Sequence, residues 1–209
     1  MIRTLQKRVV GKRSFDFVIA FLFLIACLPL LAVIAALIRI FMGPAIFFPQ
    51  QRPGINGQPF TLVKFRTMLD DCSLPESQRV TRLGRFLRRW SLDELPELWN
   101  VLRGEMSLIG PRPLLMEYLD RYSPEQRRRN EVMPGITGWA QVNGRNMISW
   151  QQKFELDLWY VKHRSLLLDL KILALTAVQV LRRAGVNQSS EQSMEEFTPS
   201  GGNSQYRSR

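Results

Sequence analysis

The chain has 209 residues, of which 45% are hydrophobic, and a formal net charge of +11. This length suits one domain with appendages. Cys27 and Cys72 are the only cysteines, so the composition excludes a disulfide framework and a cysteine-based zinc site. His163 is the single histidine, which excludes a multi-histidine metal centre. A catalytic nucleophile or base is therefore expected to be a carboxylate.

The positive charge is concentrated in the N-terminal part of the chain. Residues 1–90 contain fourteen Lys or Arg and four acidic residues, whereas residues 91–209 contain fifteen and fourteen. Such an excess fits either nucleic acid or anionic lipid, to which each basic residue contributes about 1 kcal/mol. Residues 17–38 follow the first basic cluster with 22 uncharged residues, about the length that crosses a bilayer core. The sequence therefore predicts membrane lipid, and no nucleic acid, as a partner.

The apolar segment allows two topologies, a simple span and a re-entrant hairpin. Pro29 lies near its middle and is expected to kink or break the helix. Basic residues flank both sides, with Lys12 and Arg13 before the segment, expected at the membrane surface, and Arg39 after it. A span predicts basic residues on one side only, so these features favour the hairpin, with both ends cytoplasmic. Asp16 is expected to pair with Lys12 or Arg13.

The fold class predicted is helix-dominated α+β. Residues 1–43 form the basic N-terminus and membrane helix, residues 44–186 form a compact cytoplasmic catalytic domain, and residues 187–209, rich in Ser, Gly, Gln and Asn, are expected to be disordered. A strand at 60–68 follows the Pro-Gly and Asn-Gly turn signals of residues 52–58. The helices expected, some of them amphipathic and interfacial, cover residues 83–90, 123–132, 149–163 and 165–185.

The stretch SLDELPELWNVL, residues 91–102, has two interpretations. Ser91 and Glu94 have the spacing of a capping box, in which the acids only begin a helix. Alternatively, Asp93 is a nucleophile that the helix dipole keeps ionised at pH 7, able to attack phosphorus. An anion that attacks a phosphate also requires neutralising charge, and a hard divalent cation held by one or two carboxylates is the usual solution.

Arginines near this stretch favour the second interpretation. Arg88 and Arg89 directly precede it, Arg112 lies between two prolines in GPRPL, and Arg145 follows an Asn-Gly turn. Arginines presented from rigid turns near a helix N-terminus suit a cluster of oxyanions such as a diphosphate. The residues therefore predict phosphoryl transfer.

Several motifs occur in order between residues 12 and 186: KRSFDFVIA, the apolar run with its proline, QRPGINGQPFTLVKFRTM, SLDELPELWNVLRGEMSLIGPRPL, PGITGWAQVNGRN and FELDLWYVKH. Together they resemble the bacterial sugar transferase family, the monotopic phosphoglycosyl transferases that begin glycan assembly on polyprenol phosphate. In the absence of a long multi-helix membrane region, the chain is similar to the small members of this family.

The resemblance implies a two-step, ping-pong reaction. Asp93 would attack the β-phosphorus of a UDP-sugar, release UMP and hold the sugar phosphate covalently, and undecaprenyl phosphate would then accept it as undecaprenyl-diphospho-sugar. Glu94 would bind or orient Mg²⁺, and Asp157 would support the metal or an arginine. The residues that the motifs indicate for substrate binding are Lys64, Arg66, Arg88, Arg112, Gln141, Asn143 and Arg145.

The resemblance also implies a bacterial plasma membrane protein with its catalytic domain on the cytoplasmic face and downstream glycosyltransferases as candidate partners. It departs from the family at Leu28, because members often have Ser before the helix-breaking proline. A Ser hydroxyl can satisfy a backbone carbonyl freed at the break, so the bend here would depend on Pro29 alone. The sequence leaves open the UDP-sugar and the oligomeric state.

Three other functions remain as alternatives. In a membrane-anchored basic scaffold without catalysis, the acids would be only helix caps and Asp93→Asn would be harmless. A nucleic-acid binder is disfavoured by the apolar run and by the lack of a nucleic-acid motif. A hydrolase of nucleotide-sugars or lipid phosphates would share the site but would not need polyprenol phosphate.

Overall fold

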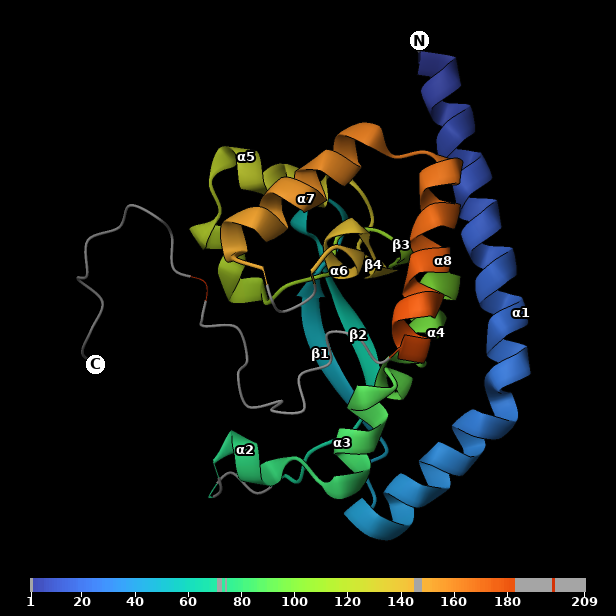
Figure 1. Cartoon of the computed structure of the whole chain (residues 1–209), viewed down its shortest axis with the longest axis vertical. Coiled ribbons are helices and arrows are strands. Elements are labelled where there is room, and N and C mark those ends of the chain that lie inside the picture. Colours follow the sequence, from blue (N-terminus) through green and yellow to red (C-terminus); the bar gives the residue numbers. More distant parts are fainter. Residues whose placement is uncertain (1, 71–72, 74, 145–147, 183–196, 198–209) are drawn as a thin grey trace, which may run out of the picture.

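The structure is a computed structural model that describes residues 2–70, 73, 75–144, 148–182 and 197. A long N-terminal helix lies along one side of a domain in which shorter helices surround two small sheets (Figure 1). This helix-dominated α+β architecture confirms the predicted fold class.

The elements are named as in Figure 1. The α-helices are α1 (Ile2–Met42), α2 (Glu76–Arg79), α3 (Arg82–Arg89), α4 (Glu97–Arg103), α5 (Pro124–Arg127), α6 (Trp139–Val142), α7 (Trp150–His163) and α8 (Leu166–Arg182). The strands are β1 (Phe47–Pro53), β2 (Pro59–Phe65), β3 (Ser107–Ile109) and β4 (Gly135–Thr137). Short 3-10 turns are η1 (Ile55–Gly57), η2 (Leu92–Glu94), η3 (Met116–Arg121) and η4 (Arg128–Glu131). The predicted strand and three of the predicted helices are present, with boundaries that differ by a few residues among those described. The helix predicted over 123–132 is instead the short α5 followed by the 3-10 turn η4.

Helix α1 continues through Pro29. It changes direction in the part that ends at Met42, so the chain bends without separating into two helices (Figure 1). A proline inside a helix removes one hydrogen bond and crowds the preceding turn, which is compatible with a kink as well as with a break. The break that the sequence favoured is therefore replaced by a bent, continuous helix.

The first part of α1 is fixed to the domain by charged side chains. Lys12 Nζ lies 2.6 Å from Asp169 Oδ2 of α8 and 3.8 Å from Asp16 Oδ1, which confirms the predicted pairing of Asp16 with Lys12. Arg13 donates hydrogen bonds to the carbonyl oxygens of Val101 and Leu102, at 2.6 and 2.9 Å. The last carbonyls of a helix lack partners within it and attract cations. Lys12 and Arg13 thus hold α1 to the domain, and their place at the membrane surface stays a prediction.

The last part of α1 is fixed to the same domain by apolar packing. Ile34, Ile38 and Met42 are buried in one cluster with Phe65 of β2 and Leu87 of α3. Both ends of the apolar segment therefore contact one domain.

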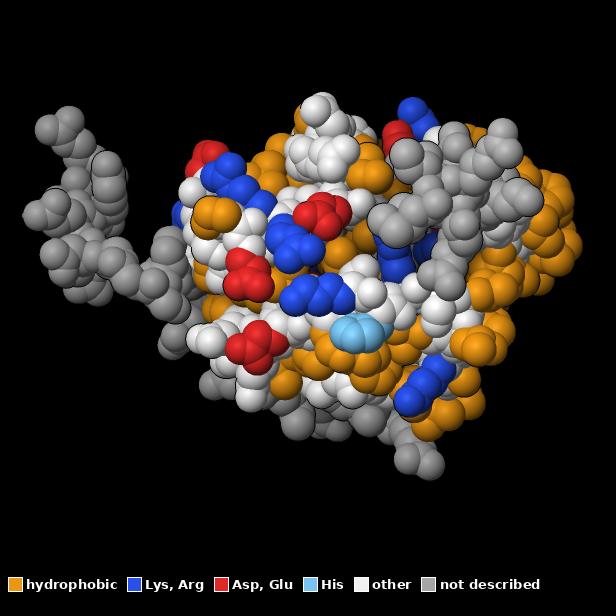
Figure 2. All heavy atoms as spheres, turned by 90° about the horizontal axis from the view of Figure 1, so that it is seen from above, with side chains coloured by type: hydrophobic (Ala, Val, Ile, Leu, Met, Phe, Trp, Pro, Cys, Tyr) orange, Lys and Arg blue, Asp and Glu red, His pale blue; other side chains and the backbone are white. Residues whose placement is uncertain are grey.

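Most of the apolar surface of α1 is uncovered. The helix is long and apolar enough to cross a membrane, and only 11% of its most apolar window is buried. Helix α8 lies beside it and also exposes Leu167 and Leu181, which are 80% and 76% accessible (Figure 1). Figure 2 shows hydrophobic side chains gathered along the edge of the molecule that these two helices form. Exposed apolar surface of this extent indicates contact with a membrane.

Of the two sheets, the sequence predicts the turn of the first but not the strand pairing of the second. Strands β1 and β2 pair antiparallel across η1, where Asn56 and Gly57 have φ of 53° and 77°, so the predicted turn is confirmed. Strands β3 and β4 pair in parallel, with Ser107 opposite Gly135 and Ile109 opposite Thr137. This parallel pair was not predicted.

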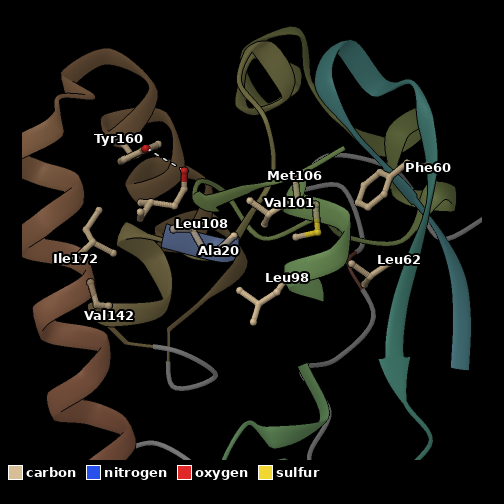
Figure 3. Packing of buried hydrophobic residues seen from close by; sticks show 11 residues of the cluster. Ala20, Phe60, Leu62, Leu98, Val101, Met106, Leu108, Val142, Tyr160 and Ile172 are labelled. Atoms are coloured by element: carbon tan, nitrogen blue, oxygen red, sulfur yellow. Dashed lines mark hydrogen bonds between the residues drawn. The ribbon is translucent and has the colours of Figure 1, made fainter. Parts of the chain in front are cut away.

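The main core joins the elements that carry the candidate site. It combines side chains from α1, β2, α4, β3, α6, α7 and α8, and Tyr160 donates a hydrogen bond of 3.2 Å to the Ile109 carbonyl oxygen (Figure 3). The labelled members are Ala20, Phe60, Leu62, Leu98, Val101, Met106, Leu108, Val142, Tyr160 and Ile172. Strand β2 and helix α4 are thereby fixed relative to β3.

Three glycines allow the chain after β3 to lie directly against β4. A Cβ atom on Gly135 would lie 2.0 Å from the Gly110 nitrogen, and one on Gly138 would lie 2.1 Å from the Gly110 oxygen. No side chain fits at these contacts. They fix the position of the GPRPL segment, and with it Arg112.

Candidate active site

Asp93 and Glu94 lie in η2, a 3-10 turn between α3 and α4. Ser91, just before them, has φ 55° and ψ 24°, the left-handed conformation, and its side chain makes no capping hydrogen bond. An N-cap residue normally has extended backbone and accepts a bond with its side chain. The capping-box interpretation of these residues is therefore wrong.

Ser91 also joins the two halves of the turn. Its backbone nitrogen donates to the Arg88 carbonyl oxygen at 3.1 Å, and its carbonyl oxygen accepts from the Glu94 nitrogen at 3.4 Å. The chain reverses at this residue, so the C-terminal end of α3 and the two acids belong to one local structure.

Two cations bind Glu94. Its Oε1 atom lies 3.1 Å from Lys64 Nζ and forms an ion pair with Arg112 Nη2. Burial alone would raise the pKa of Glu94, but the charges of Arg112 and Lys64 outweigh it and hold that pKa well below its usual range. In turn, Glu94 raises the pKa of Arg112. Glu94 is thus ionised and fixed in position.

Asp93 differs from Glu94 both in its contacts and in the direction of its pKa shift. Among the residues that the structure describes, none forms a hydrogen bond or ion pair with its carboxylate. Burial, and then repulsion from Glu94, raise the pKa of Asp93 to about 6, while Lys64, Arg112 and Arg88 act to lower it. The helix dipole was expected to favour the charged form, but burial dominates. Asp93 is still mostly ionised at pH 7 and is not committed to a partner.

Glu97 is a third carboxylate of this group, and it was not predicted from the sequence. It is 1% exposed in the first turn of α4, and its Oε1 lies 3.1 Å from Lys64 Nζ. Burial is the main reason that its pKa is raised to about 7. A local signal existed, because DELPE places three acids within five residues at the beginning of a helix.

Asp157 contributes to the site through an arginine. Its Oδ2 atom lies 2.7 Å from Arg129 Nη2, and both side chains are buried. The same Arg129 nitrogen donates to the Arg112 carbonyl oxygen at 2.8 Å. Of the two roles expected for Asp157, support of an arginine is the one that these contacts favour. Nothing local to residue 129 pointed to this role, because its partners are 17 and 28 residues away.

Two further basic residues near Arg112 were also missed. The Lys153 side chain is buried, and burial and then Arg112 lower its pKa to about 8. Burial and then the charge of Arg112 also lower the pKa of Arg52 on β1. The surroundings of Arg112 are therefore rich in positive charge, as a site for a diphosphate would require.

The predicted substrate-binding residues fall into two groups. Lys64, Arg88 and Arg112 surround the acids, and Arg88 Nε donates to Thr67 Oγ1 at 2.9 Å. Arg66 instead donates to the Met42 carbonyl oxygen and pairs with Asp70 at 2.7 Å, so it fixes the end of α1.

The predictions for the PGITGWAQVNGRN segment are less directly linked to the acids. Gln141 and Asn143 donate to the carbonyl oxygens of Ile136 and Trp139, at 3.4 and 2.8 Å, and no described contact joins either to Asp93 or Glu94. Arg145 lies outside the described residues. His163, the single histidine, ends α7 with its ring centroid 4.4 Å from that of Trp159.

The donor atoms of the acidic pair fit a magnesium ion. Within residues 2–70, 73, 75–144, 148–182 and 197, no group of three or more His, Cys, Asp or Glu could hold a metal. Magnesium is commonly held by one or two carboxylates together with waters and substrate phosphate oxygens, which needs no all-protein site. Asp93 and Glu94 supply such oxygen atoms side by side in one turn.

Comparisons with known proteins cover this whole region. A family model described as bacterial sugar transferase matches residues 7–183. The uncharacterised sugar transferase EpsL of Bacillus subtilis is 53% identical over 196 residues, which cover 91% of this chain and 96% of that protein.

Relatives with named activities match over a shorter part of their length. The undecaprenyl-phosphate galactose phosphotransferase of Salmonella typhimurium is 39% identical over 83% of this chain and 41% of its own. The UDP-glucose:undecaprenyl-phosphate glucose-1-phosphate transferase of Xanthomonas campestris is 40% identical over 83% of this chain and 39% of its own. The chain spans about two fifths of these two proteins and nearly all of the Bacillus protein.

Proposed function

Because the chain belongs to the bacterial sugar transferase family, we propose that it transfers a sugar 1-phosphate from a UDP-sugar to undecaprenyl phosphate. The products are undecaprenyl-diphospho-sugar and UMP. The observation that carries this proposal is the contrast between Glu94, bound by Lys64 and Arg112, and Asp93, which is ionised and uncommitted beside it. The names of the Salmonella and Xanthomonas relatives support the acceptor, and that of the Xanthomonas relative supports the class of donor.

In the first step an oxygen of the Asp93 carboxylate attacks the β-phosphorus of the UDP-sugar. The bond from that phosphorus to the bridging oxygen breaks, UMP leaves with the bridging oxygen, and the sugar phosphate stays on Asp93 as an acyl phosphate. Lys64, Arg88 and Arg112 lie near the carboxylate and neutralise charge on the phosphates.

In the second step a phosphate oxygen of undecaprenyl phosphate attacks the same phosphorus. The bond to Asp93 breaks, and the carboxylate is released for another cycle. Glu94 would hold Mg²⁺ together with substrate oxygens, and a bound Mg²⁺ supplies neutralising charge and polarises the phosphoryl group. Lys64 and Arg112 orient Glu94 for that role.

The attachment of α1 supports a monotopic arrangement, which we place at the cytoplasmic face of the bacterial plasma membrane. Lys12 near its start and Met42 at its end both contact the domain. If α1 crossed the bilayer as a simple span, the charged domain packed along it would have to enter the hydrocarbon, which is strongly unfavourable. The membrane segment instead enters and leaves on the side of the domain, where the acceptor phosphate lies.

The proposal is tested with detergent-solubilised protein, Mg²⁺, undecaprenyl phosphate and a panel of UDP-sugars, with UMP and lipid product both measured. Asp93→Asn should abolish both products, whereas Asp120→Asn, an exposed acid of η3, should not. Retention by Asp93→Asn of activity within about tenfold of wild type would refute Asp93 as nucleophile. Release of UMP and free sugar phosphate without a requirement for polyprenol phosphate would indicate a hydrolase.

A further inference from the structure

Phe197 lies in the C-terminal segment expected to be disordered, yet its side chain is only 3% exposed. Its backbone oxygen accepts a hydrogen bond of 2.9 Å from Arg121 Nη1. Its ring packs against four aromatic rings, at centroid distances of 5.1 Å to Phe154, 5.4 Å to Trp150, 5.7 Å to Tyr118 and 6.0 Å to Tyr122. Both the side chain and the backbone of this residue are therefore anchored on η3 and α7.

Two of these rings also hold Arg129. The Arg129 guanidinium carbon lies 5.7 Å from the Phe154 ring centroid and 6.0 Å from that of Tyr122, within the range of a cation–π contact. Arg129 is 2% exposed and is paired with Asp157. Because the guanidinium is enclosed on all of these sides, its position depends on how the two rings are packed.

Further contacts connect Arg129 with Glu94 of the acidic pair. Arg129 Nη2 donates to the carbonyl oxygen of Arg112, and the Arg112 guanidinium pairs with Glu94. Phe197, the two aromatic rings, Arg129, Arg112 and Glu94 thus form a continuous series of contacts. Phe197 is more than 100 residues from Glu94 in the sequence, so this series of contacts joins distant parts of the chain.

We infer that Phe197 is a positioning residue for the transfer reaction. By packing against Tyr122 and Phe154 it keeps Arg129, and through Arg129 the backbone of Arg112, in the position that binds the donor phosphates. This inference rests on the proposed function, in which Arg112 contacts the UDP-sugar. A displaced Arg112 would bind the donor phosphates less tightly, so its loosening should be measurable as a rise in KM.

The test uses the full-length protein with Phe197→Ala, and KM and kcat are measured from UMP release at varied UDP-sugar. We expect KM to rise at least about fivefold while kcat changes less than about twofold, because donor binding is what Arg112 supports. Phe197→Leu retains much of the apolar volume and should give a smaller rise in KM. As a control, Ile172→Val alters a core residue of α8 outside this series of contacts and should leave KM unchanged.

A second measurement separates positioning from simple stabilisation. Binding of the UDP-sugar is measured by calorimetry in the Asp93→Asn background, with and without Phe197→Ala, and the second variant should bind more weakly by the same factor as the rise in KM. An unchanged or lower KM and Kd, whatever the melting temperature, would overturn the inference. Absence of UDP-sugar turnover by the wild-type protein would refute the proposed function together with this inference, whereas normal wild-type turnover with no effect of Phe197→Ala would refute the inference alone.

Discussion

Asp93 and Glu94 are neighbours in one turn, but the cations around them act on them unequally. Lys64 and Arg112 contact Glu94 directly and reach Asp93 only through space. A half-buried carboxylate that has no partner among the described residues and lies next to a second negative charge is unfavourable for the folded state. Such a residue is retained where reactivity requires it, as expected for a nucleophile.

The pH dependence of protein stability should show how much the ionised Asp93 carboxylate destabilises the folded state. Because the pKa of Asp93 is raised from 3.8 to about 6, the folded state holds the proton more tightly than the unfolded state. The ionised group therefore destabilises the protein above pH 6, and this effect disappears below about pH 4. Asp93→Asn should increase the free energy of unfolding by about 1–3 kcal/mol at pH 7.5 and by little at pH 4, measured by thermal unfolding in detergent. A lower stability of Asp93→Asn at pH 7.5 would contradict this interpretation.

Ser91 provides a second test at the level of one residue. Its left-handed conformation costs a residue with a Cβ atom about 1 kcal/mol, and a β-branched residue more. Ser91→Gly should therefore keep UMP release and gain up to about 1 kcal/mol of stability. Ser91→Val should lose at least about 1 kcal/mol and slow UMP release, because the reversal that joins Arg88 to the acids is strained. A Ser91→Val protein as stable and active as wild type would show that the turn does not depend on this residue.

At the scale of elements, the sequence was informative where local patterns are strong. The β1–β2 hairpin was predictable from its Pro-Gly and Asn-Gly turn, and α7 and α8 from their length. Strands β3 and β4 have three residues each, too few for a periodic pattern, and their parallel pairing joins segments about 28 residues apart. The support of Arg112 by Arg129 depends on such long-range contacts and could not be predicted.

Close contact between β4 and the segment after β3 should make Gly135 intolerant of a side chain. Gly135→Ala would place a Cβ atom 2.0 Å from the Gly110 nitrogen, so the strands must separate, at a cost of at least about 2 kcal/mol. The matched control is Gly11→Ala in α1, where nothing lies within 4 Å of the added Cβ. That change should be neutral or stabilise the helix by up to about 1 kcal/mol. Equal melting temperatures for the two variants would contradict the close packing.

For the whole molecule, the apolar segment was evident from the sequence, but its attachment was not. The ion pair of Lys12 with Asp169 joins residues 157 positions apart, and no local pattern indicates it. Basic residues before an apolar segment usually face lipid headgroups, which is why the sequence predicts Lys12 and Arg13 there. In the structure both side chains contact the domain, Arg13 at the C-terminal carbonyls of α4 and Lys12 at the buried Asp169.

The same attachment predicts that both ends of the apolar segment label from one side. Gly11→Cys and Ala45→Cys, each in a background without Cys27 and Cys72, should react with an impermeant maleimide in inside-out vesicles. Neither should react in spheroplasts, because both positions are exposed beside the domain that we propose to be cytoplasmic. Labelling of the two cysteines from opposite faces would establish a simple span.

The central claim is that Asp93 carries the sugar phosphate covalently, and intact-mass spectrometry tests it most directly. Detergent-solubilised protein is incubated with Mg²⁺ and each UDP-sugar in the absence of polyprenol phosphate. The predicted result is a mass increase equal to one sugar phosphate, which is lost in Asp93→Asn, retained in Asp120→Asn and discharged by undecaprenyl phosphate. A preparation that makes lipid product but never shows the adduct would contradict the claim, and Asp93 would then be a base or a metal ligand in a direct transfer.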